Sequence, residues 1–369
     1  MKRRLLALVL ICLLVVTLAA CGQNQPDATP TPVDTETEEP AQVEPAPEEP
    51  TQEEPTPEEP AQEETGEFDP LENPIAMSIF LRAHPVHQMM IAGFMSRAQE
   101  LGYEPHLFSP DEVDAPMTHG MTESGIALFG IRGISIHNMD ESTAHYIQRF
   151  ADQGIAVVMG HTQIRPEDRA DFPGLLAYAA ASAENIARDS AIKIGTEIDG
   201  QGTVAITLGS FNHMEIFKSE VFTSTMNEMF PDVEVLEPVE EGFDLPTAIQ
   251  RATAIAQANP DLVAAFSTTG GGPSTWAGAQ RNIGRSLAVI SMDYTRANLE
   301  LVREGEIFAV VAQPLIEAWA RTAELLDSHL RGETIEFSNV LDAPFVTIDN
   351  VDEFFELVER AEAAFAAIN

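Results

Sequence analysis

Residues 75–108 read IAMSIFLRAHPVHQMMIAGFMSRAQELGYEPHLF, and this stretch indicates the fold class. The apolar run at 75–81 predicts a buried strand of a parallel sheet, since such strands are covered on both faces. Residues 86–101 predict an amphipathic helix, and Gly102 follows in the position where glycine commonly ends a helix. A second strand is expected at 104–108. Strand, helix and strand in this order predict a β/α unit.

The same alternation continues along the chain in two sets, which predicts an α/β fold of two Rossmann-like lobes with parallel sheets. The first set adds strands at 133–137 and 155–160 and a helix at 142–153. An alanine-rich segment at 177–194 is expected to be a helix, after which the second set begins. Its strands are expected at 202–208, 233–238, 262–267, 287–292 and 307–312, and helices at 214–229, 246–258, from about 275, 296–304, 315–331 and 351–368.

Residues 1–21 are arranged as an export signal. A basic start precedes an apolar run at 5–16, and LAAC at 18–21 resembles the bacterial lipobox, whose cysteine is lipidated and becomes the new N-terminus. The alternative is a membrane-spanning helix, but the run is shorter than the roughly 20 residues that crossing requires. We therefore expect a signal peptide, lipidation at Cys21, and attachment to the outer face of the cytoplasmic membrane.

Residues 22–72 have the composition of a tether. They contain seventeen Asp and Glu residues, no Lys or Arg, and many prolines. Such a segment cannot bury a core, so charge repulsion and proline stiffness predict an extended, disordered chain. A specific acidic binding arm is the alternative.

The body at 73–369 carries 17 basic and 42 acidic residues, for a net charge of −25. A surface this acidic repels phosphate backbones, so we do not expect nucleic-acid binding. Both cysteines, Cys12 and Cys21, precede the body. Their positions exclude a disulfide, a cysteine metal site and a cysteine nucleophile within it.

The body carries no recognisable catalytic motif. It has no Gly-x-Ser-x-Gly elbow, no phosphate loop and no His-Glu-x-x-His pattern. The glycines at 270–272 follow a strand, but they lack the dinucleotide-binding spacing and precede Pro273. They predict a loop that lets a ligand approach the backbone, with a cofactor cradle as the alternative. We therefore expect neither an enzyme nor a cofactor.

Seven phrases of the body, in this order and spacing, resemble the type I periplasmic binding proteins, the ribose-binding-like solute receptors of ABC importers. The phrases are AHPV at 83–86, GF at 93–94, ELGY at 100–103, NPDLVAAF at 259–266, SMD at 291–293, REGEI at 303–307 and VAQP at 311–314.

The resemblance implies two lobes that close like a jaw on a small solute, joined by three hinge crossings. The crossings are expected near 176–179, 313–314 and 339–341. The N-terminal lobe would then comprise 73–177 and 314–339, and the C-terminal lobe 178–313 and 340–369. A monomer is expected, with an ABC permease as its membrane partner. Ligand selects the closed state, and the permease recognises that state.

Two binding residues follow from this resemblance, each with a structural alternative. Asp293 stands at the position of the family's ligand-binding aspartate, and its carboxylate can accept two hydroxyl hydrogen bonds. The alternative is an N-cap of the following helix. Gln313 matches the family's binding glutamine beside the hinge, and its amide both donates and accepts. The alternative is a structural hydrogen bond within the hinge.

Further candidates depart from the family pattern in part. His84 and His87 stand where ribose-type receptors have an asparagine and an aromatic residue, and surface or capping histidines are the alternative. His161 follows a strand where the sugar-binding pattern has an Asp-Arg pair, and Thr269 replaces an asparagine. Phe243 matches a stacking aromatic, with a loop anchor as the alternative. Two polar residues at strand ends complete the set, Asn138 and Asn212.

These side chains are polar and largely uncharged, so a neutral hydroxylated solute such as a sugar or polyol is expected. Two other functions remain open. One is a sensory receptor that passes lobe closure to a membrane signalling protein. The other is a metal-binding or metal-dependent hydrolytic protein, prompted by imidazoles and a carboxylate in one region, namely His84, His87, His161 and Asp293.

Overall fold

A computed structural model describes residues 68–111, 114–138, 140 and 142–368. The predicted signal peptide, the lipidation of Cys21 and the tether up to residue 67 lie outside the described residues. No helix among the described residues combines the length and apolarity needed to cross a membrane.

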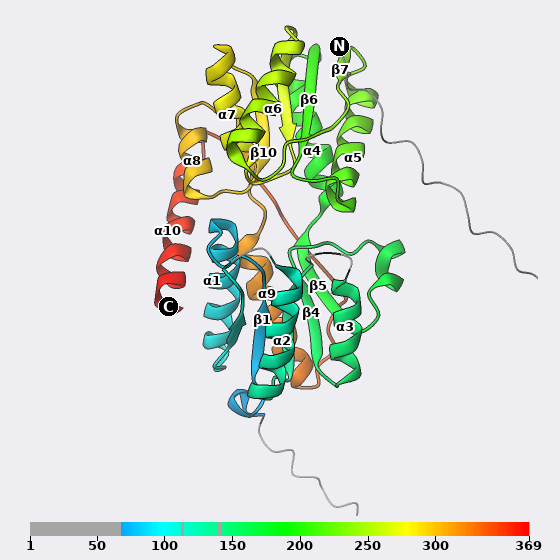
Figure 1. The fold of residues 1–369 in the computed structure, drawn as a ribbon, viewed down its shortest axis with the longest axis vertical. Coiled ribbons are helices and arrows are strands. Elements are labelled where there is room, and N and C mark those ends of the chain that lie inside the picture. Colours follow the sequence, from blue (N-terminus) through cyan, green and yellow to red (C-terminus); the bar gives the residue numbers. More distant parts are fainter. Residues whose placement is uncertain (1–67, 112–113, 139, 141, 369) are drawn as a thin grey trace, which may run out of the picture. The chain divides into compact units, whose positions relative to one another are not determined.

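The described residues form two sheets in separate lobes, as predicted (Figure 1). All pairings in the six-stranded first sheet are parallel. Its spatial order is β12 (Ser338–Leu341), β5 (Leu175–Ala181), β4 (Ala156–Gly160), β3 (Gly133–His137), β1 (Ile75–Ser78) and β2 (His106–Phe108).

The second sheet has seven strands and is parallel except where β13 pairs with β11. Its order is β13 (Phe345–Val346), β11 (Ala309–Val311), β10 (Ala288–Met292), β9 (Leu262–Ser267), β6 (Gly202–Leu208) and β7 (Val233–Val235), with β8 (Val239–Glu240) also pairing with β6. In the first sheet every residue of β1, β3 and β4 is buried, because helices cover both faces.

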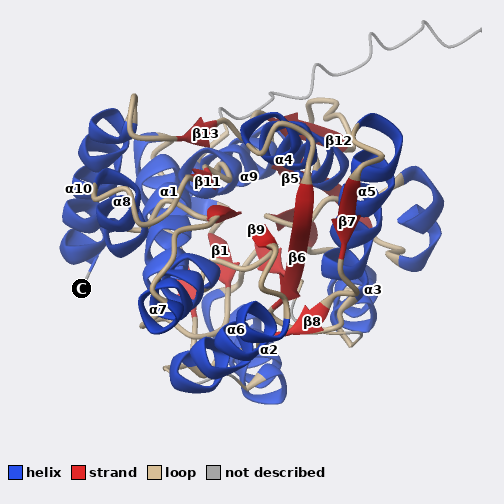
Figure 2. Ribbon diagram, turned by 90° about the horizontal axis from the view of Figure 1, so that it is seen from above, coloured by secondary structure: helices blue, strands red, loops and turns tan. Residues whose placement is uncertain are grey.

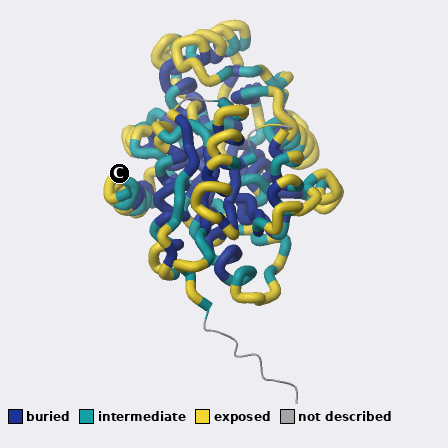
Figure 3. Tube along the Cα trace, turned by 60° about the horizontal axis from the view of Figure 1, so that its bottom comes forward, coloured by how far each residue is buried: buried dark blue, intermediate teal, exposed yellow. Residues whose placement is uncertain are grey.

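Helices cover the sheets from outside, so the strands form the interior (Figure 2). Exposed segments lie mostly on the outer helices and turns (Figure 3). The first lobe has α1 (Pro85–Glu100), α2 (Ala115–Phe129), α3 (Thr143–Asp152) and α9 (Leu315–Leu330). The second lobe has α4 (Ala183–Glu197), α5 (His213–Met229), α6 (Leu245–Ala258), α7 (Gly272–Ile283) and α8 (Arg296–Arg303). Two short 3-10 helices are η1 (Pro70–Glu72) and η2 (Pro166–Asp171).

The last helix, α10 (Val351–Ile368), contacts both lobes. It packs against α1 of the first lobe and α8 of the second, and Figure 1 shows it beside both. The sequence prediction assigned this segment to the C-terminal lobe alone.

The chain crosses between the sheets three times, but two crossings come later than predicted. β5 pairs with β4 up to Ala179 and with β12 up to Ala181, so the first crossing falls at Ser182 and not at 176–179. β12 pairs through Leu341, so the third crossing falls at 342–344. The second crossing follows β11 at 312–314, close to the predicted position. The lobe boundaries predicted at 177 and 339 are therefore a few residues too early.

The predicted alanine-rich helix at 177–194 is wrong in its first part, because residues 177–181 belong to β5. Alanine favours helix, but this strand lies inside the sheet and its small side chains are buried on both faces. The helix α4 begins only after Ser182, whose Oγ accepts a hydrogen bond from the backbone N–H of Asn185 at 3.2 Å.

The helix α2 was not predicted, because its sequence carries little helical signal. It includes two glycines and several Ser and Thr residues, which favour other conformations. Asp114 starts it by accepting a 2.7 Å hydrogen bond from the backbone N–H of Met117. Gly125 lets the helix approach the sheet, since a Cβ there would lie 2.2 Å from the ring of Phe108.

Residues 68–72 belong to the folded body, although the sequence predicts them as tether. Asp69 caps η1 by accepting a 2.9 Å hydrogen bond from the backbone N–H of Leu71. The guanidinium of Arg331 lies 4.5 Å above the centre of the Phe68 ring. A cation over an aromatic face holds this start of the body onto the end of α9.

Candidate functional site

Three imidazole rings gather at the carboxyl ends of the strands of the first lobe. His137 is the last residue of β3, His161 follows β4, and His87 lies in the first turn of α1. The ring of His137 lies 5.6 Å from that of His87 and 5.5 Å from that of His161, measured between centroids. Phe80 adds an edge contact at 5.1 Å from His137. The sequence analysis predicted His87 and His161 here but missed His137.

Backbone carbonyls fix the tautomer of two of these rings. Nδ1 of His87 lies 3.1 Å from the carbonyl oxygen of Leu81, and Nδ1 of His137 lies 3.0 Å from that of Asn138. A carbonyl oxygen only accepts hydrogen bonds, so both Nδ1 atoms carry the proton. Each Nε2 is then left with a lone pair that can accept a hydrogen bond from a ligand hydroxyl.

The imidazoles of this group are held in their neutral form. Burial, together with the neighbouring His84, lowers the pKa of His87 to about 4. Burial and the ammonium of Lys218 lower the pKa of His161 to about 3. Burial also places the pKa of His137 well below its usual value. The first lobe therefore presents acceptors without charge at neutral pH.

A carboxylate and an amide face the site from the second lobe. Asp293 follows β10, and its Oδ1 accepts a 2.7 Å hydrogen bond from Nε2 of Gln313, which follows β11. Burial raises the pKa of Asp293 to about 6, while Gln313 and the ammonium of Lys218 lower it. The N-cap of α8 is Thr295, whose Oγ1 accepts from the N–H of Asn298 at 3.4 Å. The N-cap alternative for Asp293 is therefore wrong.

His161 and Asp293 share an uncommon backbone conformation. Their φ angles are 71° and 69°, in the left-handed region that side chains other than glycine rarely adopt. Each follows directly after the end of a central strand, β4 in one lobe and β10 in the other. Local strain of this kind is concentrated at functional sites, where it aims a side chain in a required direction.

The structure also adds a buried cation that the sequence analysis missed. Lys218, on α5, is 8% exposed and has no hydrogen bond or ion pair among the described residues. Its ammonium acts electrostatically on His161 of the first lobe and Asp293 of the second. The body at 73–369 contains only two lysines, Lys193 and Lys218. This scarcity was the one sequence feature that pointed, weakly, to a special role for a lysine.

Two glutamates of the second lobe accept hydrogen bonds from groups at and near the carboxyl ends of its strands. Glu215 accepts hydrogen bonds from the N–H of Gly209 at 2.6 Å and from Oγ1 of Thr268 at 2.7 Å. Glu241 is 1% exposed and accepts from Ser267 and Thr275 at 3.1 and 3.2 Å. Burial raises the pKa of Glu241 to about 7.

Contacts between the lobes show that the strand ends of the two sheets face one another. Nη2 of Arg165, which follows β4, donates a 2.7 Å hydrogen bond to Nε2 of His213 at the start of α5. The same guanidinium lies 4.8 Å above the ring of Phe217. Asp168 holds Arg165 in place through two hydrogen bonds of 2.7 and 3.1 Å.

Three other predicted ligand residues belong to the second lobe. Asn212 caps α5, since its Oδ1 accepts from the N–H of Glu215 at 2.9 Å. Phe243 is 78% exposed, and a Cβ at Gly209 would lie 2.8 Å from its ring. Thr269 uses its carbonyl to accept from Oγ of Ser291 at 2.8 Å.

The remaining two lie beside the imidazole group. His84 is exposed, and its ring lies 5.2 Å from that of His87. It stands at the N-cap of α1 but makes no capping hydrogen bond with its side chain. Asn138 is half-buried and contributes its carbonyl to the His137 bond.

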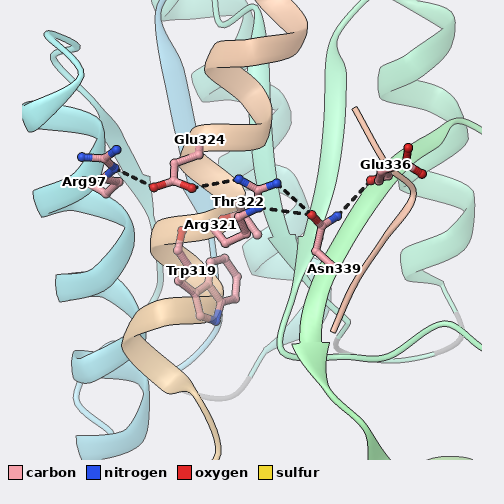
Figure 4. Close-up of polar contacts among 7 residues, drawn as sticks. All are labelled: Arg97, Trp319, Arg321, Thr322, Glu324, Glu336 and Asn339. Atoms are coloured by element: carbon pink, nitrogen blue, oxygen red, sulfur yellow. Dashed lines mark hydrogen bonds and ion pairs between the residues drawn. The ribbon is translucent and has the colours of Figure 1, made fainter. Parts of the chain in front are cut away.

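The indole of Trp319 supports the imidazole group from below. It is stacked on His137 with 6.2 Å between ring centroids and 6° between planes, and its buried Nε1 has no partner among the described residues. Polar contacts hold its helix α9 in place (Figure 4). Nε of Arg97 donates to Glu324 at 2.9 Å, and Arg321 donates to Oδ1 of Asn339 at 3.1 Å. The network therefore ties α9 to α1 and to β12.

The metal-binding alternative lacks a geometric basis in the part of the chain that the structure describes. There, no group of three or more His, Cys, Asp or Glu side chains is arranged to hold a metal ion. Asp293, in particular, uses its carboxylate for Gln313.

Comparison with known proteins gives a family match and many similar folds. A family model described as a periplasmic binding protein domain matches residues 75–334. Comparison with curated proteins gives no match.

Three solved structures illustrate the fold similarity. AraP, an arabinose binding protein from Geobacillus stearothermophilus, has 19% sequence identity and a TM-score of 0.69, covering 76% of this chain and 99% of that one. An ABC transporter solute binding protein from Bacillus halodurans C-125 with bound myo-inositol has 18% identity and a TM-score of 0.69, covering 78% and 99%. The XylFII-LytSN complex has 17% identity and a TM-score of 0.65, covering 75% and 98%.

Proposed function

Because the chain belongs to the periplasmic binding protein family, we propose that it captures a sugar or sugar-like polyol between its lobes and delivers it to an ABC importer. Membership in this family indicates that the chain is a solute-binding protein that works outside the cytoplasm. The ligand class and the partner transporter are what we propose.

One observation carries the proposal: in each lobe, a residue that directly follows a strand interacts with the same buried ammonium. His161 of the first lobe and Asp293 of the second both interact with the ammonium of Lys218. A ligand at this point would touch both lobes and would stabilise the arrangement in which they meet. Such a ligand needs no chemical change to be recognised, so we propose binding without catalysis.

The polar groups of the site suit hydroxyls. The free Nε2 atoms of His87 and His137 accept hydrogen bonds, and the pair of Asp293 and Gln313 offers both acceptor and donor atoms. Similar folds include an arabinose binding protein and a solute binding protein with bound myo-inositol. Those ligands are rich in hydroxyls, which supports the proposed ligand class for this chain.

The proposed mode of action places the protein on the membrane surface. We propose that export removes residues 1–20, that lipid on Cys21, the new N-terminus, anchors the chain, and that the acidic segment up to residue 67 tethers a monomeric body. The body would then reach a permease without leaving the membrane.

A thermal-shift screen tests the ligand class directly. A ligand that binds only the folded state raises the melting temperature. At one hundred times its Kd it adds about 2.7 kcal/mol to the free energy of unfolding. Pentoses, hexoses, inositols and nucleosides should include at least one compound that gives a saturable rise. A chemically altered product after incubation with pure protein would contradict the proposal of binding without catalysis.

A sensory receptor of the same fold is the second candidate. The XylFII-LytSN complex contains a chain of the same fold, so a protein of this architecture can form a complex with a partner. Reconstituted uptake with a permease would favour import, whereas ligand-dependent association with a membrane signalling protein would favour sensing.

A further inference from the structure

The charge of Lys218 is the feature of the site that a neutral sugar explains least well. Its side chain comes from the second turn of α5 and is 8% exposed. Burying an ammonium without a partner is costly, because the lost hydration is not replaced. Since no hydrogen bond or ion pair in the described residues replaces it, the ammonium has donor capacity to offer a ligand.

The nearby carboxylates do not take this role. Asp293 accepts its hydrogen bond from Gln313 at 2.7 Å. Glu215 is occupied by the N–H of Gly209, by Thr268 and by Nδ2 of Asn212, at 2.6 to 2.8 Å. Both carboxylates influence the ammonium electrostatically, but neither lies within ion-pair distance of it.

The groups around the ammonium define the rest of the ligand. His161 of the first lobe and Asp293 of the second both interact electrostatically with it. The ring of His137, whose Nε2 can accept from a hydroxyl, lies 5.5 Å from that of His161, and Gln313 is bonded to Asp293. A ligand that satisfies all of them carries several hydroxyls and one anionic group. Charge-assisted hydrogen bonds to an ammonium are stronger than those from neutral acceptors.

We propose that the ligand is a polyhydroxylated carboxylate, a sugar acid, and that the ammonium of Lys218 binds its carboxylate group. This inference rests on the proposed function and names the ligand class of the same site. It differs from the neutral solute that the sequence predicts.

Isothermal titration of matched pairs tests the inference. The probes are D-glucuronate against D-glucose and D-galacturonate against D-galactose, each with the intact body of the protein. The acid of at least one pair should bind at least about 10-fold more tightly than its neutral partner, since a hydrogen bond to a charged group contributes about 1.5–3 kcal/mol.

Substitution of the lysine then separates charge from shape. Lys218→Met keeps much of the length without the charge, and we expect the acid to bind roughly 10- to 100-fold more weakly. Lys218→Arg keeps the charge and should retain part of the affinity. Lys193→Met is the matched control, because it removes the other lysine of the body, on α4. Its affinity for the acid should equal that of the wild type.

The outcomes distinguish the inference from the proposed function. Equal or tighter binding of the neutral partner, or undiminished acid binding by Lys218→Met, overturns the inference and leaves a sugar receptor. Absence of binding by every sugar and every sugar acid overturns the proposed function as well. Circular dichroism of each variant checks folding, and Lys218→Arg keeps the test valid if Lys218→Met does not fold.

Discussion

Nε2 of Gln313 donates a 2.7 Å hydrogen bond to Oδ1 of Asp293, and the two residues follow neighbouring parallel strands of the second lobe. Gln313 also lies on the second crossing between the lobes. The amide therefore orients the carboxylate and connects it to the segment that links the sheets. A hydrogen bond at the hinge and a ligand contact are thus compatible roles for these two side chains.

The first prediction concerns Asp293. Asp293→Ala should abolish the ligand-dependent rise in melting temperature, because it removes an acceptor from the site and releases Gln313. The ligand-free melting temperature should stay within a few degrees, since the substitution also removes a buried carboxylate. Differential scanning fluorimetry with and without ligand gives both values.

Asp349→Ala serves as the control for this variant, because Asp349 is exposed in the turn before α10. It should keep the full ligand response. If Asp293→Ala unfolds without ligand, the role of Asp293 is structural and its assignment as a binding residue is wrong.

The second prediction concerns pH. The pKa of His161 is about 3 in the folded protein, below the ordinary 6.5 of an unfolded histidine. Its contribution to stability is therefore present above pH 6.5 and is lost as the pH falls, at about 1.4 kcal/mol per pH unit for one proton. His161→Asn should lessen the acid loss of unfolding free energy between pH 6 and 4. Asparagine tolerates the left-handed backbone at this position.

The pKa of Asp293 is shifted in the opposite direction, so its effect on the pH dependence of the unfolding free energy has the opposite sign and provides the control. Its pKa is about 6 when folded against an ordinary 3.8, so the folded state binds the extra proton between these values. Acidification through this window adds stability, and Asp293→Asn should make the acid loss steeper. Urea unfolding at half-unit pH steps measures both slopes. Parallel slopes for the two variants would contradict the assigned protonation states.

The alternation of apolar runs and amphipathic helices was enough to predict the central strands of both sheets, because buried parallel strands are continuously hydrophobic. The short strands β12 and β13 were not predicted. The alternation also failed at residues 177–181, where alanines suggest helix but the segment pairs with strands on both sides. Such pairing depends on residues more than 150 positions away in β12, which no local pattern contains. The helix α2 was not predicted, for the opposite reason. Its sequence has only a weak helical preference, and its packing against Phe108 stabilises the helix nevertheless.

The site shows the same limit. Asp293 and His161 were predicted from the family resemblance together with their places after strands, and both interact with one ammonium in the structure. Lys218 and Glu241 were missed because their significance comes from burial. A lysine in an amphipathic helix and a glutamate in an acidic loop are ordinary until the fold removes them from water.

The third prediction tests the contact between α1 and α9, which carries Trp319 beneath the imidazoles. A Cβ at Gly93 would lie 2.3 Å from the carbonyl oxygen of Ile316, a backbone atom that cannot yield without moving α9. Gly93→Ala should therefore lower the unfolding free energy by about 1–3 kcal/mol. Gly120→Ala is the matched control in α2, where nothing lies within 4 Å, and it should add about 0.5–1 kcal/mol. Urea denaturation gives both values, and equal effects would contradict the close packing.

The last prediction concerns α10, which contacts both lobes. Val358 is 2% exposed and shares a small cavity lining with Met89 of α1 and Thr295. Val358→Ala should lower the unfolding free energy by about 1–3 kcal/mol, because two buried methyl groups are lost. Arg296→Ala breaks the pair with Glu362 at 2.7 Å, but both side chains are more than a third exposed, so its cost should stay below about 1 kcal/mol. A larger effect of Arg296→Ala than of Val358→Ala in urea unfolding would mean that charge rather than apolar packing holds α10 across the lobes.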